Sequence, residues 1–143
     1  MLVLSYSFKM AAVEFRKITI LRITRPAKES INADVQWLSN SLGLVSLRDK
    51  SRSCYRVFIE LLKAAKKGNA LSSDEISFHT SLSRGTVIHH LNHLMASGIV
   101  VHHAGKYALR VRDLKQLVRS IRDDLNASLS EIEDIASEID RNI

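Results

Sequence analysis

The segment from Leu82 to Val100, LSRGTVIHHLNHLMASGIV, is the most informative part of the sequence, because its residue pattern changes at Gly98. Up to that glycine, apolar residues recur at the spacing of a helix that packs one face against a core. They are Val87, Ile88, Leu91, Leu94 and Met95. Ser83 is a typical N-cap, and a glycine after the last apolar residue is a typical helix stop. The segment therefore predicts a helix from Ser83 to just before Gly98.

Beyond Gly98 the spacing of apolar residues shortens to two. Ile99–His102 and Tyr107–Arg110 are strand-like, and His103–Lys106 lies between them as a four-residue reversal. Gly105 stands where the turn needs a positive φ. The sequence therefore predicts a β-hairpin directly after the helix.

Two more helices are expected upstream. One begins at Ser51 as N-cap and ends at Lys66–Gly68, where cations and a glycine suit a helix C-terminus. The other begins at the capping box Ser72–Glu75 and runs to about His79. The short turn Thr80–Leu82 then leads into the helix of the opening segment. Helices of this length joined by such a turn indicate a helix-turn-helix.

The helix that begins after Ser83 has an outward face with hydrogen-bond donors and no acidic residue. A helix in the major groove presents its N-terminal half to base edges, and its free amides favour phosphate. The arginine fork suits guanine or phosphate, and a glycine lets the backbone approach DNA closely. We expect DNA contacts from Ser83, Arg84, Gly85, Thr86, His89 and His93.

The N-terminal third is interpreted as an extension of this domain. Residues 1–14 are expected to be flexible and to carry no function. Residues 15–45 are expected to hold a short strand ended by Pro26, then a helix closed by Gly43. The DNA-binding domain is assigned to residues 46–111.

The last segment, residues 112–143, reads as one long helix with two apolar series of heptad spacing. Such a pattern favours a coiled coil between two copies, although the helix could instead pack within its own chain. Ser128 is the one polar break in the two series. The expected dimerisation residues are Leu114, Val118, Ile121, Leu125, Ile132, Ile135 and Ile139.

Composition narrows the classes of function. The chain has 143 residues, a formal charge of +6 and a pI near 9.7, which favours a polyanionic partner. Its single cysteine, Cys54, fits a reducing cytoplasm, and no stretch is long enough for a transmembrane helix. No enzyme motif is present, so no catalytic residue or cofactor is expected. His89 and His93 are four residues apart, which is a spacing that can share a metal, but the prediction is that there is no metal site.

The segment also resembles a known family. Leu82–Val87, His90-Leu91, Leu94, Ala96–Val100 and the glycine-containing hairpin look like the ArsR-type winged helix-turn-helix regulators, including related archaeal regulators. The resemblance covers about Ser51 to Arg110. It implies a dimeric repressor or activator in which the third helix reads DNA and the hairpin, or wing, holds the backbone. By this resemblance Lys106 contacts a phosphate.

One departure from the family limits what is carried over. Many members sense metals through paired cysteines, which this chain lacks, so no effector is assigned.

The expected fold is mainly α with a small β-hairpin wing, a long C-terminal dimerisation helix and a short N-terminal strand. The expected function is sequence-specific regulation of transcription by a homodimer on double-stranded DNA. The alternatives are a winged-helix protein-interaction module and a non-specific architectural DNA binder.

Overall fold

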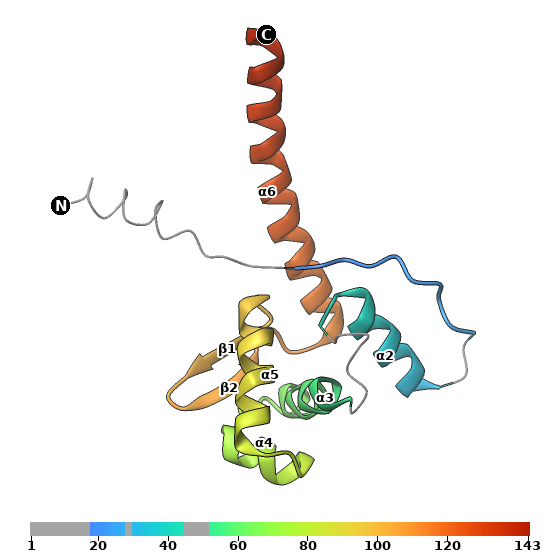
Figure 1. Ribbon diagram of the computed structural model, residues 1–143, viewed down its shortest axis with the longest axis vertical. Helices are drawn as coiled ribbons and strands as arrows, with labels where there is room; N and C mark the ends of the chain where they lie inside the picture. The colour runs from blue at the N-terminus through green and yellow to red at the C-terminus, as the bar shows by residue number, and fades with distance from the viewer. Residues whose placement is uncertain (1–17, 28–29, 45–51) are drawn as a thin grey trace, which may run out of the picture.

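The computed structural model describes residues 18–27, 30–44 and 52–143 (Figure 1). The prediction for residues 1–14 lies outside these ranges, and so does Ser51 itself. Within them the chain is mainly helical, with one antiparallel hairpin. The elements are α2 (Ile31–Ser41), α3 (Ser53–Lys66), α4 (Ser73–Thr80), α5 (Arg84–Ala96), β1 (Val100–His103), β2 (Lys106–Leu109) and α6 (Leu114–Asn142).

The core is built around α3, which packs against α4, α5 and β2. Its apolar face is buried along the whole helix. The innermost side chains of the winged domain come from α3, α4 and α5 and from the residue before β1. They include Val57, Phe58, Leu61, Ile76, Val87, Leu91, Leu94 and Ile99. The fold class is therefore a winged helix-turn-helix with a long C-terminal helix.

The hairpin is tighter than predicted. His103 pairs with Lys106, so only Ala104 and Gly105 form the turn, instead of four residues. Both have positive φ, 51° and 75°, which is the geometry of the two-residue turn that matches strand twist. Glycine adopts this conformation without cost, whereas Ala104 does not.

The hairpin is also fixed to the loop before α4. Leu71 N donates to Tyr107 O at 2.9 Å, and Tyr107 N donates to Leu71 O at 2.7 Å. The wing is thereby held against the helix-turn-helix by backbone hydrogen bonds.

The predicted N-terminal strand is wrong over residues 18–24, and residues 15–17 lie outside the described ranges. These residues are extended, but their backbone bonds to a helix instead of a neighbouring strand. Leu21 N donates to Ser41 O at 2.8 Å, and Trp37 Nε1 donates to Ile23 O at 3.2 Å. The β-branched residues thus belong to an extended segment that is hydrogen-bonded to α2 (Figure 1).

The helix predicted after Pro26 is confirmed as α2, capped by Ser30. The chain leaves it through Gly43, whose φ is 62°. A Cβ at this position would lie 2.6 Å from Thr19 O. Both the backbone conformation and the close approach of the N-terminal segment therefore require glycine here.

The N-cap of α3 is Arg52, whose φ of 55° is left-handed and whose side chain makes no capping hydrogen bond. The sequence favoured Ser51 because serine is a better cap. The guanidinium of Arg52 instead bonds to Gln36 Oε1, across to α2.

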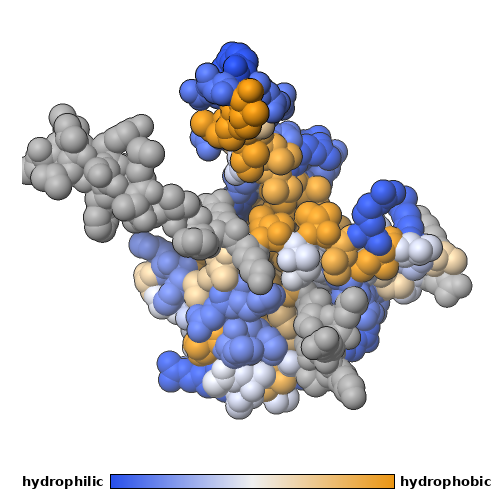
Figure 2. Space-filling view, turned by 45° about the horizontal axis from the view of Figure 1, so that its top comes forward, coloured by the Kyte–Doolittle hydropathy of each residue, from blue (hydrophilic) through white to orange (hydrophobic). Residues whose placement is uncertain are grey.

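The long helix α6 changes its environment along its length. Leu117 and Ile121 are buried in the core, whereas every residue from Leu125 onward is exposed. Figure 1 shows the distal part projecting away from the other elements, and Figure 2 shows apolar surface along it. No helix within the described ranges is long and apolar enough to cross a membrane.

Arg110 ties the base of the hairpin to α6. Its guanidinium lies 2.9 Å from Asp124 Oδ2 and also bonds to Ser120 Oγ. Its backbone N–H donates to Ile99 O at 2.9 Å. The wing and the proximal half of α6 are therefore held as one unit.

Candidate nucleic-acid interface

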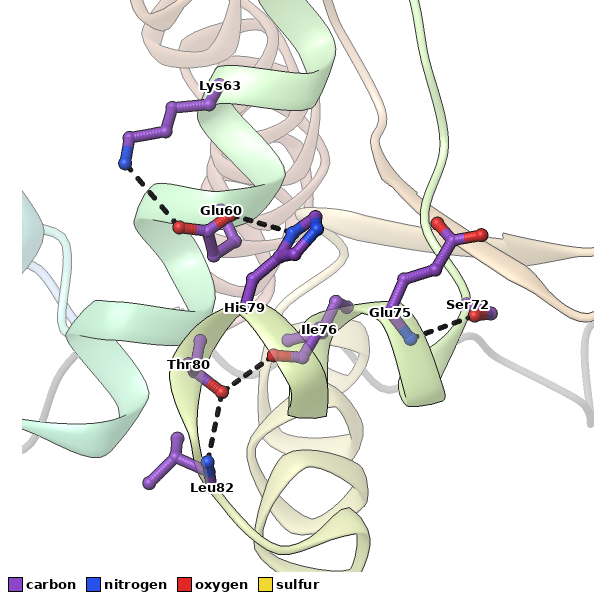
Figure 3. Close-up of polar contacts among 8 residues, drawn as sticks. All are labelled: Glu60, Lys63, Ser72, Glu75, Ile76, His79, Thr80 and Leu82. Atoms are coloured by element: carbon purple, nitrogen blue, oxygen red, sulfur yellow. Dashed lines mark hydrogen bonds and ion pairs between the residues drawn. The ribbon is translucent and has the colours of Figure 1, made fainter.

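The turn between α4 and α5 is held by a set of hydrogen bonds (Figure 3). Thr80 Oγ1 donates to Ile76 O at 2.7 Å and accepts from Leu82 N at 3.4 Å. The Arg56 guanidinium on α3 donates to Thr80 O. Ser81 adopts a left-handed φ of 57° in the turn. These contacts fix the direction in which α5 leaves α4.

The N-terminus of α5 is capped as predicted. Ser83 Oγ accepts from Thr86 N at 3.2 Å, and its hydroxyl donates to Thr86 Oγ1 at 2.8 Å. The cap therefore uses the side chains of two predicted DNA-contacting residues. The first turn of α5 is therefore stabilised by side chains of the chain itself.

Beyond this cap the outward face of α5 is open to solvent. Arg84, Gly85, His89 and His93 are exposed, and Thr86 is half-buried. A Cβ at Gly85 would meet no atom within 4 Å. Gly85 thus leaves room for close approach by a partner and is not required by its own packing. The residues predicted to contact DNA share one accessible surface.

Asn92 was missed by the sequence reasoning, although it lies on this same face. It is exposed and stands three residues after His89 and seven after Gly85. An asparagine on a helix in the major groove is suited to adenine. The helical spacing alone was enough to place it there.

Two acidic residues from the first turn of α4 also reach this surface. Asp74 Oδ1 lies 3.6 Å from Arg84 Nε, and Glu75 Oε1 lies 3.8 Å from Lys106 Nζ. The sequence placed Glu75 in a capping box with Ser72. Its backbone N–H does donate to Ser72 Oγ at 3.1 Å, while its carboxylate faces the hairpin. Arg84 and Lys106 thus have acidic partners on α4, which the sequence pattern around each residue did not predict.

The histidines serve different local contacts. His102 stacks on Tyr107 with ring centroids 4.1 Å apart, and His90 Nε2 lies 2.8 Å from Ser53 Oγ. His79 Nδ1 lies 3.2 Å from Glu60 Oε2 (Figure 3). In the part of the chain that the structure describes, no group of three or more His, Cys, Asp or Glu side chains is placed to hold a metal ion.

Comparison with protein families gives a match. Residues 59–101, from the middle of α3 into β1, match the family model described as bacterial regulatory protein, arsR family. Neither the curated proteins nor the solved structures gave a significant match. The matched stretch contains the helix-turn-helix and the start of the wing, which are the elements that shape the surface described above. Residues 59–101 are therefore similar to the helix-turn-helix region of the arsR family, and they lie within a winged helix-turn-helix fold.

Proposed function

We propose that this protein is a homodimeric transcription regulator that recognises a specific double-stranded DNA sequence. The observation that carries the proposal is the exposed face of α5, which begins at a capped helix N-terminus and bears no acidic residue of its own. The wing stands beside the same end of the domain, because Lys106 and Arg84 both contact neighbouring residues of α4.

On this proposal α5 enters the major groove with its N-terminal half against the base edges. Arg84 reads guanine, and Gly85 allows the helix to approach closely. Thr86 and His89 offer further polar contacts, with Ser83 and His93 at the two ends of the surface. Lys106 binds a phosphate beside the groove and sets the orientation of the domain.

The proposed dimer forms through the distal half of α6. Leu125, Ile132, Ile135 and Ile139 are exposed at heptad spacing, and Leu129 widens this stripe. Apolar stripes of this length on a soluble helix favour burial against a partner helix. Leu114, Val118 and Ile121 lie at the base of the helix, where Ile121 is only 3% exposed within its own chain. We therefore assign most of the dimer contact to Leu125 and beyond.

Fluorescence anisotropy tests the proposal, with the upstream DNA of the protein's own gene and a scrambled duplex across a salt series. We expect preference for the native duplex and affinity that falls steeply with salt, because cations at the interface displace condensed counterions. Equal affinity for both duplexes would indicate an architectural DNA binder. Absence of binding at about 50 mM salt, where phosphate attraction is strong, would overturn the proposal and favour a protein-interaction module.

A further inference from the structure

The first turn of α4 brings two carboxylates to the surface proposed to face DNA. Asp74 and Glu75 are adjacent in the chain, yet they contact different elements. Asp74 lies 3.6 Å from Arg84 at the start of α5, and Glu75 lies 3.8 Å from Lys106 in the wing. Each of the two strongest cationic candidates for DNA contact is thus already paired with an anion.

Both pairs lie in solvent. The side chains of Arg84 and Asp74 are 70% and 77% exposed, and those of Lys106 and Glu75 are 53% and 45% exposed. Exposed ion pairs contribute little to stability, because water and salt screen both charges. A phosphate can therefore take the place of either carboxylate without disturbing the core.

The carboxylates stay near this surface when DNA separates the two ion pairs. They belong to a helix whose N-terminus is fixed by the Ser72 cap and by its contact with α3. A duplex that binds Arg84 and Lys106 must then lie close to two fixed negative charges. Like charges a few ångströms apart repel, even in water.

We infer that Asp74 and Glu75 compete with DNA phosphate for Arg84 and Lys106. They thereby lower the affinity of the winged domain for any duplex. The inference rests on the proposed function, because it takes α5 and the wing as the DNA-binding surface. It goes further by giving α4 a part in binding. The two carboxylates keep the cations paired in the free protein and weaken every complex by a similar factor.

Isosteric neutral variants test the inference. Asp74→Asn and Glu75→Gln remove one charge each and keep the size of the side chain. We expect each to tighten binding of both the native and the scrambled duplex by roughly three- to tenfold at about 50 mM salt. The gain should shrink at high salt, where exposed charges are screened.

Matched controls lie on α6. Asp134→Asn and Glu133→Gln make the same chemical changes on exposed residues far along that helix. They should change DNA affinity by less than about twofold, because separations beyond a Debye length are screened. Thermal unfolding of all four variants checks that loss of an acidic residue from the first turn of α4 has not unfolded the domain.

A double-mutant cycle assigns the mechanism. In an Arg84→Ala background, Asp74→Asn should give a smaller gain, because the cation that it frees is absent. If the wild type binds DNA and the neutral variants bind equally or more weakly, the inference is wrong and the carboxylates orient the cations instead. A variant that carries both Asp74→Asn and Glu75→Gln completes the test. If neither the wild type nor this double variant binds any duplex, the proposed function and the inference both fail.

Discussion

Arg84 and Lys106 have the same charge and different surroundings. Arg84 begins a helix, and its planar fork suits two parallel hydrogen bonds to guanine or phosphate. Lys106 follows the two-residue turn of the wing, and its flexible ammonium acts as a point charge. Under the proposed function, this difference suits Arg84 to the reading of bases and Lys106 to attraction by the DNA backbone.

Replacement of Arg84 by alanine should weaken binding to the native duplex by about 1–3 kcal/mol and relax the preference at one base pair. The measurement is anisotropy against duplexes in which each base pair of the site is changed in turn. Arg84→Lys is the control, because it keeps the charge and loses the fork. An equal loss on all sequences would reassign Arg84 to a phosphate.

Replacement of Lys106 by alanine should weaken binding to native and scrambled duplexes alike. The slope of log affinity against log salt should fall by about one, since one phosphate contact is lost. Lys115→Ala, on an exposed residue of α6, removes the same charge elsewhere and serves as the control. An unchanged slope would remove Lys106 from the interface.

At the scale of elements, local signals were predictable from the sequence and contacts between distant segments were not. The caps of α4 and α5 were predicted correctly, because a serine hydroxyl acts within its own turn. The strand over residues 15–24 failed over its described part, because the alternation of residues 18–24 does not say what the backbone bonds to. The pairing of Asp74 with Arg84 was missed for the same reason.

The turn of the wing offers a prediction about stability. Ala104 occupies a left-handed conformation that asparagine and glycine tolerate better than alanine. Ala104→Asn should therefore stabilise the protein by up to about 1 kcal/mol, and Ala104→Val should destabilise it. Thermal unfolding measures both. If the asparagine and valine variants unfold at the same temperature, Ala104 carries no backbone strain.

In the whole molecule, the proposed DNA-contacting surface and the proposed dimer contact lie at opposite ends. The helix-turn-helix lies at one end of the molecule, and the distal part of α6 projects from the other (Figure 1). The heptad spacing predicted the long helix correctly. It did not show that Leu117 would be buried, since this residue lies outside both apolar series. The homodimer itself stays a prediction.

Ile132→Asp tests the proposed association. Ile132 is 64% exposed, and an added charge in an apolar seam should shift the protein from dimer to monomer. Ser137→Asp adds the same charge on the opposite face of the same helix and should leave the dimer intact. Sedimentation of both variants gives their masses. If Ile132→Asp sediments as a dimer, the distal stripe is not the contact.

In α6, Leu117 and Ile121 are buried, whereas the residues from Leu125 onward are exposed. The two halves of the helix are therefore stabilised in different ways. The proximal half is held by the fold of its own chain, whereas a helix without tertiary contacts is only marginally stable in water. Amide hydrogens of the distal half should therefore exchange quickly in dilute protein and slowly in concentrated protein, and those of the proximal half should not change. Order at the tip of the molecule would then report how many copies are present.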